Sequence, residues 1–291
     1  MNNFDMYVGI DWSGAKSPIK SSSISVAYVD RGNFSPVILS HLNSRHEIAL
    51  WIQEKAQETK RILIGIDCNF GYAREVGHKH FGQNYNYKDV WSEVDRTSHH
   101  LDNFYAEGFW THSQYRDDFW ITGTQREDFK IYRRQTEIAC QRIGLGVPES
   151  PFKLIGAKQV GKGGLAGMRL ANFLTQQLGS TVCFWPFETS QANQAKIVVT
   201  EIYPRLFIRL ASQKMTKIRC VSDLNQILSY FQTDPYDAPL EINDHQADAL
   251  ISAVGLRFLC GSKTTIPDSI AIPFGMTAEI AVTEGWIFGV T

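Results

Sequence analysis

The sequence predicts an α/β fold in which helices flank a mixed β-sheet, made of an antiparallel meander plus parallel strands. Residues 7–11 and 61–66 are short runs that are apolar on both faces, which is typical of strands in the middle of a covered sheet. The runs 24–29 and 37–42 extend the first strand into an antiparallel meander, because a turn-forming Asp-Arg-Gly-Asn stretch lies between them. A helical run then carries the chain back across the sheet, so that later strands can lie parallel to the first.

Ser44 and Glu47 form a capping box at the start of the helix expected over 45–59, where apolar residues recur at helical spacing. Caps, turn residues and apolar spacing define the later elements in the same way. These are a connector at 161–164 before a helix over 166–178, strands over 181–187 and 197–200, a helix at Pro204, a helix capped by Ser222, a last helix over 244–260 between Asn243 and Gly261, and a hairpin at Glu284 and Gly285.

The 291 residues fit one domain, in which residues 72–151 form an inserted subdomain rich in histidine and aromatic side chains. This insertion is expected to be helical and rich in loops. The formal net charge is -1, but the charges are unevenly distributed. Between Lys153 and Arg219 ten Lys and Arg stand against Glu188 and Glu201, so the middle of the chain is expected to form a basic surface.

The five cysteines are widely spaced and include no Cys-x-x-Cys pair. This pattern indicates reduced thiols and a cytoplasmic protein. No apolar run approaches the roughly 18 residues of a membrane-spanning helix, so no membrane partner is expected. The sequence leaves the oligomeric state open.

Four acidic residues occupy positions that suggest a shared site. Asp11 and Asp67 each end a predicted central strand, so their carboxylates should meet at one edge of the sheet. Asp244 and Asp248 are four residues apart and point from one face of the last helix. Carboxylate oxygens on rigid elements suit Mg²⁺ or Mn²⁺, and two such ions about 3.5–4 Å apart serve displacement at phosphorus. We therefore predict a site for two divalent ions.

Each of these residues also has a purely structural interpretation. Asp11 alone could cap a turn by accepting backbone N–H groups, and Asp244 in a first helical turn complements the helix dipole. Glu201 is either a further metal ligand, a group that orients one, or a surface residue that ends a strand. The Gly-Lys-Gly-Gly run at 161–164 could cradle a phosphate, but it lacks the Walker spacing, and a connector is favoured.

The order of these segments resembles domain-of-unknown-function family 429, described as predicted nucleases of ribonuclease H-like fold. The segments that carry the resemblance are 8–11 with 13–14, 65–67 with 70–71, 132–137, 201–204 and 248–253. The run His-Gln-Ala-Asp-Ala-Leu at 245–250 also resembles the closing helix of Holliday-junction resolvases, whose paired aspartates bind metal. The resemblance implies a ribonuclease H-like fold and a metal site to which Asp248 belongs more securely than Asp244.

Residues and resemblance together predict a divalent-metal-dependent nuclease that hydrolyses phosphodiester bonds in DNA or RNA. The expected catalytic residues are Asp11, Asp67, Asp248 and Glu201, and the expected metal ligands are Asp11, Asp67, Asp244 and Asp248. The cations expected to bind the substrate's phosphates on two rims of the site are Arg126, Arg133, Arg134, Lys158, Lys162 and Arg169. The alternatives are a kinase or ATPase of the actin-like superfamily, whose first strand also ends in Gly-Ile-Asp, and a non-catalytic nucleic-acid-binding protein on the same fold.

Overall fold

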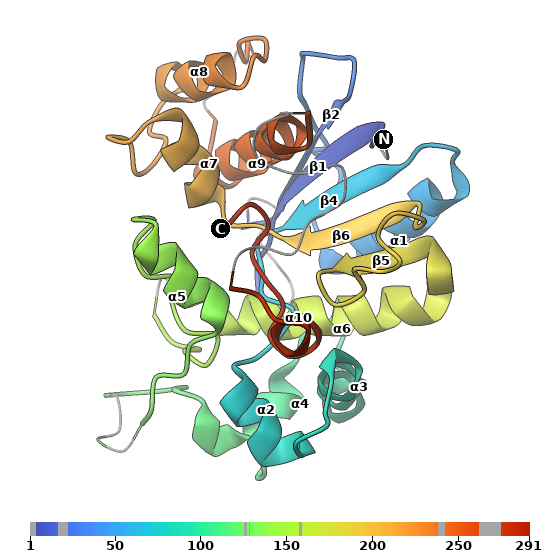
Figure 1. Cartoon of the computed structure of the whole chain (residues 1–291), viewed down its shortest axis with the longest axis vertical. Coiled ribbons are helices and arrows are strands. Elements are labelled where there is room, and N and C mark those ends of the chain that lie inside the picture. The colour runs from blue at the N-terminus through green and yellow to red at the C-terminus, as the bar shows by residue number, and fades with distance from the viewer. Residues whose placement is uncertain are drawn as a thin grey trace.

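The computed structural model describes residues 4–16, 23–124, 127, 129–156, 159–237, 242–261 and 275–291. Within them, six strands form one mixed sheet in the order β3-β2-β1-β4-β6-β5 (Figure 1). The parallel strands are β1 (Met6–Asp11), β4 (Ile62–Ile66), β5 (Val182–Trp185) and β6 (Ile197–Glu201), and the antiparallel meander adds β2 (Ser25–Asp30) and β3 (Val37–Ile38). The prediction of an α/β fold with a mixed sheet is confirmed.

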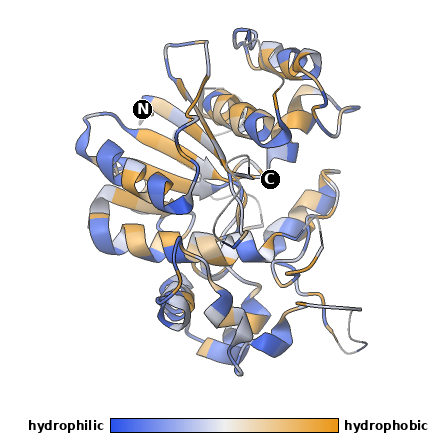
Figure 2. Cartoon of the chain, turned by 180° about the vertical axis from the view of Figure 1, so that it is seen from behind, coloured by the Kyte–Doolittle hydropathy of each residue, from blue (hydrophilic) through white to orange (hydrophobic). Residues whose placement is uncertain are grey.

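The two central strands are buried along their whole length, because helices cover both faces of the sheet. Val8 and Ile10 join the core beneath α1 (Arg45–Gln57) and α6 (Gly161–Leu178), whereas Tyr7 points into the core on the other face. The helices on that other face are α7 (Pro204–Ala211), α8 (Val221–Tyr230) and α9 (Asp244–Gly261). Figure 2 shows the hydrophobic strands between helices that have both hydrophobic and hydrophilic residues.

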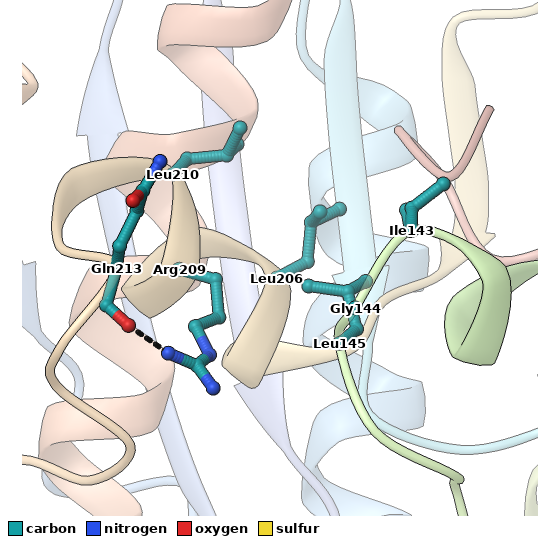
Figure 3. A pocket seen from close by; sticks show the side chains of 7 residues that line it. All are labelled: Ile143, Gly144, Leu145, Leu206, Arg209, Leu210 and Gln213. Atoms are coloured by element: carbon teal, nitrogen blue, oxygen red, sulfur yellow. Dashed lines mark hydrogen bonds between the residues drawn. The ribbon is translucent and has the colours of Figure 1, made fainter.

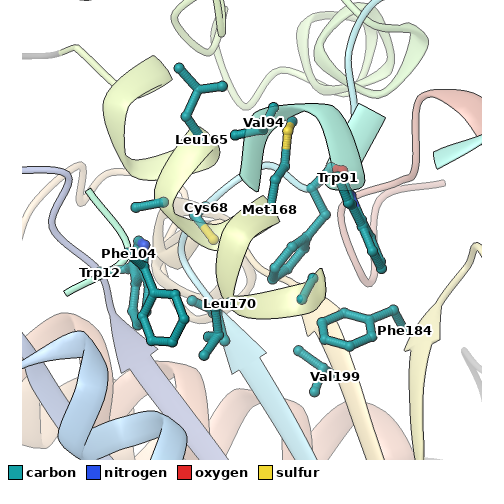
Figure 4. Packing of buried hydrophobic residues seen from close by; sticks show 14 of the residues in the cluster. Trp12, Cys68, Trp91, Val94, Phe104, Leu165, Met168, Leu170, Phe184 and Val199 are labelled. Atoms are coloured by element: carbon teal, nitrogen blue, oxygen red, sulfur yellow. Dashed lines mark hydrogen bonds between the residues drawn. The ribbon is translucent and has the colours of Figure 1, made fainter. Parts of the chain in front are cut away.

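Residues between β4 and α6 form the predicted helical insertion, which lies beyond α6 in Figure 1. Its helices are α2 (Arg74–Phe81), α3 (Tyr87–Ser98), α4 (Glu107–Thr111), the short 3-10 helix η2 (Arg116–Asp118) and α5 (Gln135–Arg142). Trp91 of α3 packs against Phe184 of β5, with their ring centroids 5.0 Å apart, and Met168 of α6 belongs to the same cluster (Figure 4). The insertion therefore shares the core of the sheet.

The predicted helix caps at two places are confirmed. The capping box of Ser44 and Glu47 is complete at the start of α1. At the start of α9, the side chain of Asn243 accepts a hydrogen bond of 2.8 Å from the backbone N–H of Gln246. Pro204 is the first residue of α7, where a missing N–H costs nothing.

Three local expectations are wrong. The glycine run at 161–164 is the first turn of α6 and no connector, and Cβ atoms at Gly161 and Gly164 would collide with Pro151 and Asn69. Helix α8 begins one residue before Ser222, with Cys220 as its cap residue. The tail forms the short helix α10 (Ala278–Thr283) and then pairs in parallel with Glu201 through Ile287, instead of forming a hairpin. A further 3-10 turn, η3 (Gly179–Thr181), precedes β5.

Two glycines let helix α9 approach the centre of the sheet. Gly9 and Gly65 are direct partners in the pairing of β1 with β4. A Cβ atom at Gly9 would lie 2.3 Å from the carbonyl oxygen of Ala249, and one at Gly65 would lie 2.8 Å from Leu256. The repeated Gly-Ile-Asp sequence therefore serves packing as well as the strand ends, because it seats α9 across both strands. None of the described helices is long and apolar enough to span a membrane.

Candidate functional site

Asp11 and Asp67 lie side by side at the carboxyl end of the sheet. Strands β1 and β4 are parallel and pair Ile10 with Ile66, so the next residue of each strand is an aspartate. The backbone N–H of Asp67 donates a hydrogen bond of 2.9 Å to the carbonyl oxygen of Ile10, which continues the pairing by one residue. Adjacent strands are about 4.8 Å apart. The predicted convergence of these two residues at one sheet edge is therefore present in the backbone.

Asp248 reaches the same place from helix α9. The helix crosses β1 and β4 on the glycine pair described above, and Ala247 and Ala249, on either side of Asp248, are buried. Asp248 itself is half-buried. Its charge raises the pKa of Asp67, and Asp11 does the same, so the three carboxylates share one electrostatic environment.

Burial and mutual repulsion make ionisation of this cluster unfavourable. Burial raises the pKa of Asp67 well above its usual range, and every charged neighbour that contributes, namely Asp11, Asp248 and Glu201, raises it further. Burial and the charge of Asp11 likewise raise the pKa of Asp248 to about 7. A group of carboxylates that disfavours its own charge to this degree would be stabilised by a bound cation.

His245 is a member of the site that the sequence did not single out. It lies in the first turn of α9, and its Nδ1 is 2.5 Å from Oδ2 of Asp11. Burial raises the pKa of Asp11, and the hydrogen bond with His245 opposes that shift. The same hydrogen bond raises the pKa of His245. A histidine three residues before Asp248 on a helix is the spacing that could have indicated this neighbour.

Asp244 does not join the cluster. Its side chain is exposed and forms an ion pair of 2.5 Å with Lys217. Among the residues that the structure describes, no group of three or more His, Cys, Asp or Glu side chains is placed to hold a metal ion. The donor chemistry suits a hard cation, but binding one through three carboxylates would require side chains to turn, beginning with the Asp11 carboxylate that His245 holds.

Glu201 ends the neighbouring strand β6 but has a different partner. Both of its carboxylate oxygens accept hydrogen bonds from Arg134, at 2.6 and 2.7 Å. Arg134 is 1% exposed and also pairs with Glu137 at 2.6 Å. Burial raises the pKa of Glu201, and the guanidinium opposes that shift. Glu201 is thus one side of a buried ion pair next to the cluster, and its oxygens are already engaged.

Most of the cations predicted to bind substrate have other roles. Arg134 is fully engaged in the ion pair with Glu201, and Arg169 is buried, where it binds Asp95 at 2.8 Å and the carbonyl oxygens of two loop residues. Those two predictions are wrong, since neither guanidinium is free for a phosphate. Arg133 is half-buried and donates to the carbonyl oxygen of Pro148. Lys162 lies over the ring of Trp110, and Arg126 and Lys158 fall outside the described residues.

The loop that follows Asp11 is held rigidly by residues from elsewhere. Arg45 is fully buried and donates hydrogen bonds to the carbonyl oxygens of Ser13 and Ala15. Burial lowers the pKa of Arg45 to about 10. A Cβ atom at Gly14 would lie 2.2 Å from the backbone nitrogen of Gly163, so the loop packs directly on the first turn of α6. The space beside the turn at Gly14 is therefore occupied by the first turn of α6.

Comparisons with known proteins supply no relative for this chain. No family model matches the sequence, and no curated protein and no solved structure matches it either.

Proposed function

We propose that this protein is a divalent-metal-dependent nuclease whose ribonuclease H-like domain hydrolyses phosphodiester bonds at the Asp11, Asp67 and Asp248 cluster. The observation that carries the proposal is the convergence of three acidic residues from three elements, each with its pKa raised by burial and by another acid. Two of these acids lie at adjacent strand ends of an α/β sheet, where such folds place ligands.

Asp67 is the central ligand in this proposal, because the charged neighbours that shift its pKa are all acids, namely Asp11, Asp248 and Glu201. Asp11 and Asp248 would complete the oxygen donors on either side, for Mg²⁺ or Mn²⁺. When bound, such ions supply charge for the leaving oxygen and lower the pKa of a coordinated water. His245 holds the Asp11 carboxylate in the present arrangement, and Arg134 opposes the rise that burial causes in the pKa of Glu201 beside the site.

Two observations favour this proposal over an actin-like kinase. The glycine turn after Asp11 packs on Gly163, where a phosphate would have to enter. The described residues form one six-stranded sheet, whereas the actin-like fold duplicates its domain.

A nuclease assay on fluorescent oligonucleotides tests the proposal. We expect cleavage by the purified protein in Mn²⁺, no cleavage in EDTA, and a loss of more than about 100-fold in rate for Asp67→Asn. Asp102→Asn is the matched control, since it makes the same chemical change at an exposed residue of the insertion. Equal cleavage by wild type and Asp67→Asn would show that the activity lies elsewhere or comes from a contaminant, and would contradict the proposal.

A further inference from the structure

A groove of about 360 Å³ lies between the end of helix α5 and helix α7 (Figure 3). Ile143 and Leu145 form one wall, and Leu206 and Leu210 form the other. Ile143 is 43% exposed and Leu210 is 38% exposed, so an apolar surface faces solvent here. The groove therefore offers a flat apolar group a place to be buried.

The polar side of the same groove is cationic. The segment 202–222, which contains α7, has no acidic residue and carries Arg205, Arg209, Lys214, Lys217 and Arg219. Arg205 and Arg209 are one helical turn apart, so they extend from the same side of α7. The Arg209 guanidinium lines the groove and donates a hydrogen bond to the carbonyl oxygen of Gln213 (Figure 3).

Both arginines have a donor without an acceptor. The Nε–H groups of Arg205 and Arg209 are buried and have no hydrogen-bond partner among the described residues. An unsatisfied buried donor on a charged group costs about 1–3 kcal/mol or more, and an anionic oxygen is the acceptor that satisfies a guanidinium best. Since these Nε atoms are buried, an anion from solution would meet the guanidinium groups at their terminal nitrogens, beside the apolar walls.

Tyr203 is an electrostatic neighbour of both the carboxylate cluster and Arg205, which lies one helical turn before the groove residue Arg209. Arg205 lies near Tyr203, whose hydroxyl pKa is raised by burial and also by the charge of Asp67, while Arg205 opposes that shift. On the other side, Lys217 pairs with Asp244 and so ties the cationic segment to the first turn of α9. Among the described residues, Arg205 and Lys217 thus bring cations of segment 202–222 near the carboxylate cluster. Arg169, by contrast, is buried, and Lys196 binds the carbonyl oxygen of Ala56 at the far end of the sheet.

We propose that this groove holds a single-stranded stretch of nucleic acid adjoining the phosphodiester bond at the cluster, with phosphates on Arg205 and Arg209 and a base against Ile143 and Leu210. The inference rests on the proposed function, because it names the substrate of that site. A polyanion approaching a carboxylate cluster needs flanking cations. An unpaired base exposes an apolar face that fits these walls, whereas a base in a duplex keeps that face stacked.

Binding of a fluorescent single-stranded oligonucleotide, measured by anisotropy in Ca²⁺ at several salt concentrations, tests the inference without requiring cleavage. We expect Arg209→Gln to weaken binding about tenfold and to reduce the slope of log affinity against log salt by about 0.7, the value for one phosphate contact on a single strand. Gln213→Glu, which places an anion in the groove, should weaken binding by about fivefold or more.

Gln57→Glu is the matched control. Gln57 is exposed like Gln213 but lines a polar hollow near Lys196, where strands β5 and β6 begin. We expect it to bind within about twofold of wild type. Thermal melts of all three variants establish that each is folded. The substitutions at Gln57 and Gln213 do not alter the core, because both side chains are exposed.

The possible outcomes separate the two proposals. If wild type binds single strands and both groove variants bind as tightly as Gln57→Glu, the groove inference is overturned and the nuclease proposal stands. If wild type binds no single-stranded, double-stranded or branched oligonucleotide at low salt, the proposed function itself fails. If poly-glutamate of equal charge displaces the oligonucleotide as well as an unlabelled strand does, recognition is by charge alone, and the assignment to a single strand is wrong.

Discussion

Two neighbouring groups of buried carboxylates differ in what surrounds them. At the ends of β1 and β4, Asp67 is surrounded by other acids, and its pKa is raised well above the usual range. One strand further along, Glu201 is 6% exposed and more fully buried than Asp67, and Arg134 binds both of its oxygens. The same chemical group thus serves two purposes. The carboxylate of Glu201, which Arg134 compensates, joins elements of the fold. For the cluster around Asp67, whose contributing charged neighbours are acids, we propose that a cation from solution supplies the compensation.

The paired group extends well beyond Glu201. Arg134 also donates to the carbonyl oxygen of Glu284, whose carboxylate accepts hydrogen bonds from the backbone N–H groups of Arg74 and Gln135. Those N–H groups begin helices α2 and α5. The network therefore joins the insertion, the end of β6 and the C-terminal tail, and it is a structural device at the border of the site.

The largest effect is expected from breaking the paired group. Arg134→Gln leaves Glu201 and Glu137 buried without their cation, so we expect a loss of about 3–5 kcal/mol in the free energy of unfolding, measured by denaturant titration. Arg133→Gln is the control, since this neighbour binds one carbonyl oxygen and no carboxylate. The double variant Arg134→Gln, Glu201→Gln should recover part of the loss. A cost below about 1 kcal/mol for Arg134→Gln would show that the pair is not structural.

A smaller effect is expected where helix α9 meets the sheet. Gly9→Ala would place a Cβ atom 2.3 Å from the carbonyl oxygen of Ala249, so the helix must shift, at a cost of about 1–3 kcal/mol. Gly32→Ala makes the same change where no atom lies within 4 Å. Denaturant midpoints of the two variants measure the difference. Equal stability would mean that α9, and Asp248 with it, is not positioned by this contact.

An effect of opposite sign, a gain in stability that depends on pH, is expected at the carboxylate cluster of Asp11, Asp67 and Asp248. Asp248 has a folded-state pKa of about 7 against its usual 3.8, so the folded protein binds this proton more tightly than the unfolded chain does. Its contribution to stability is therefore greatest below pH 3.8 and is lost as the pH rises toward 7. Asp248→Asn should melt like wild type near pH 4 and at a higher temperature above pH 7. A variant that melts lower at every pH would identify Asp248 as a structural residue.

The strand ends of the fold could be predicted because apolar runs stop at charged residues. Strands β1 and β4 each end within a residue of Asp11 or Asp67, and desolvation forbids an unpaired charge further inside. The glycine run at 161–164 was harder to interpret. Glycine disfavours a helix by its own propensity. In the fold, a Cβ atom at Gly164 would lie 1.9 Å from Oδ1 of Asn69, a close contact that depends on tertiary structure.

Residues of the site could be predicted where local sequence places them, and could not where their partner is distant in sequence. Asp67 follows a buried strand, which local sequence shows directly. The partnership of Arg134 with Glu201 joins residues 67 positions apart, and that of His245 with Asp11 joins residues 234 apart. Arg134 and Arg169 were predicted to bind the substrate because they are cationic. Their charge does not show that both side chains are buried in the fold. The cations expected to form one basic surface over 153–219 are divided among separate places, since Arg169 is buried and Lys196 binds Ala56 at the far end of the sheet, while segment 202–222 carries five of them.

The central claim is that the cluster around Asp67 receives a cation and that Glu201, which Arg134 binds, does not. Its most direct test is anomalous diffraction from crystals of the protein soaked in Mn²⁺. We predict anomalous density within about 2.0–2.6 Å of carboxylate oxygens of Asp67 and of at least one of Asp11 and Asp248. No density is expected between Glu201 and Arg134. A soaked crystal with no peak at Asp67, or with its peak at Glu201, would contradict this account.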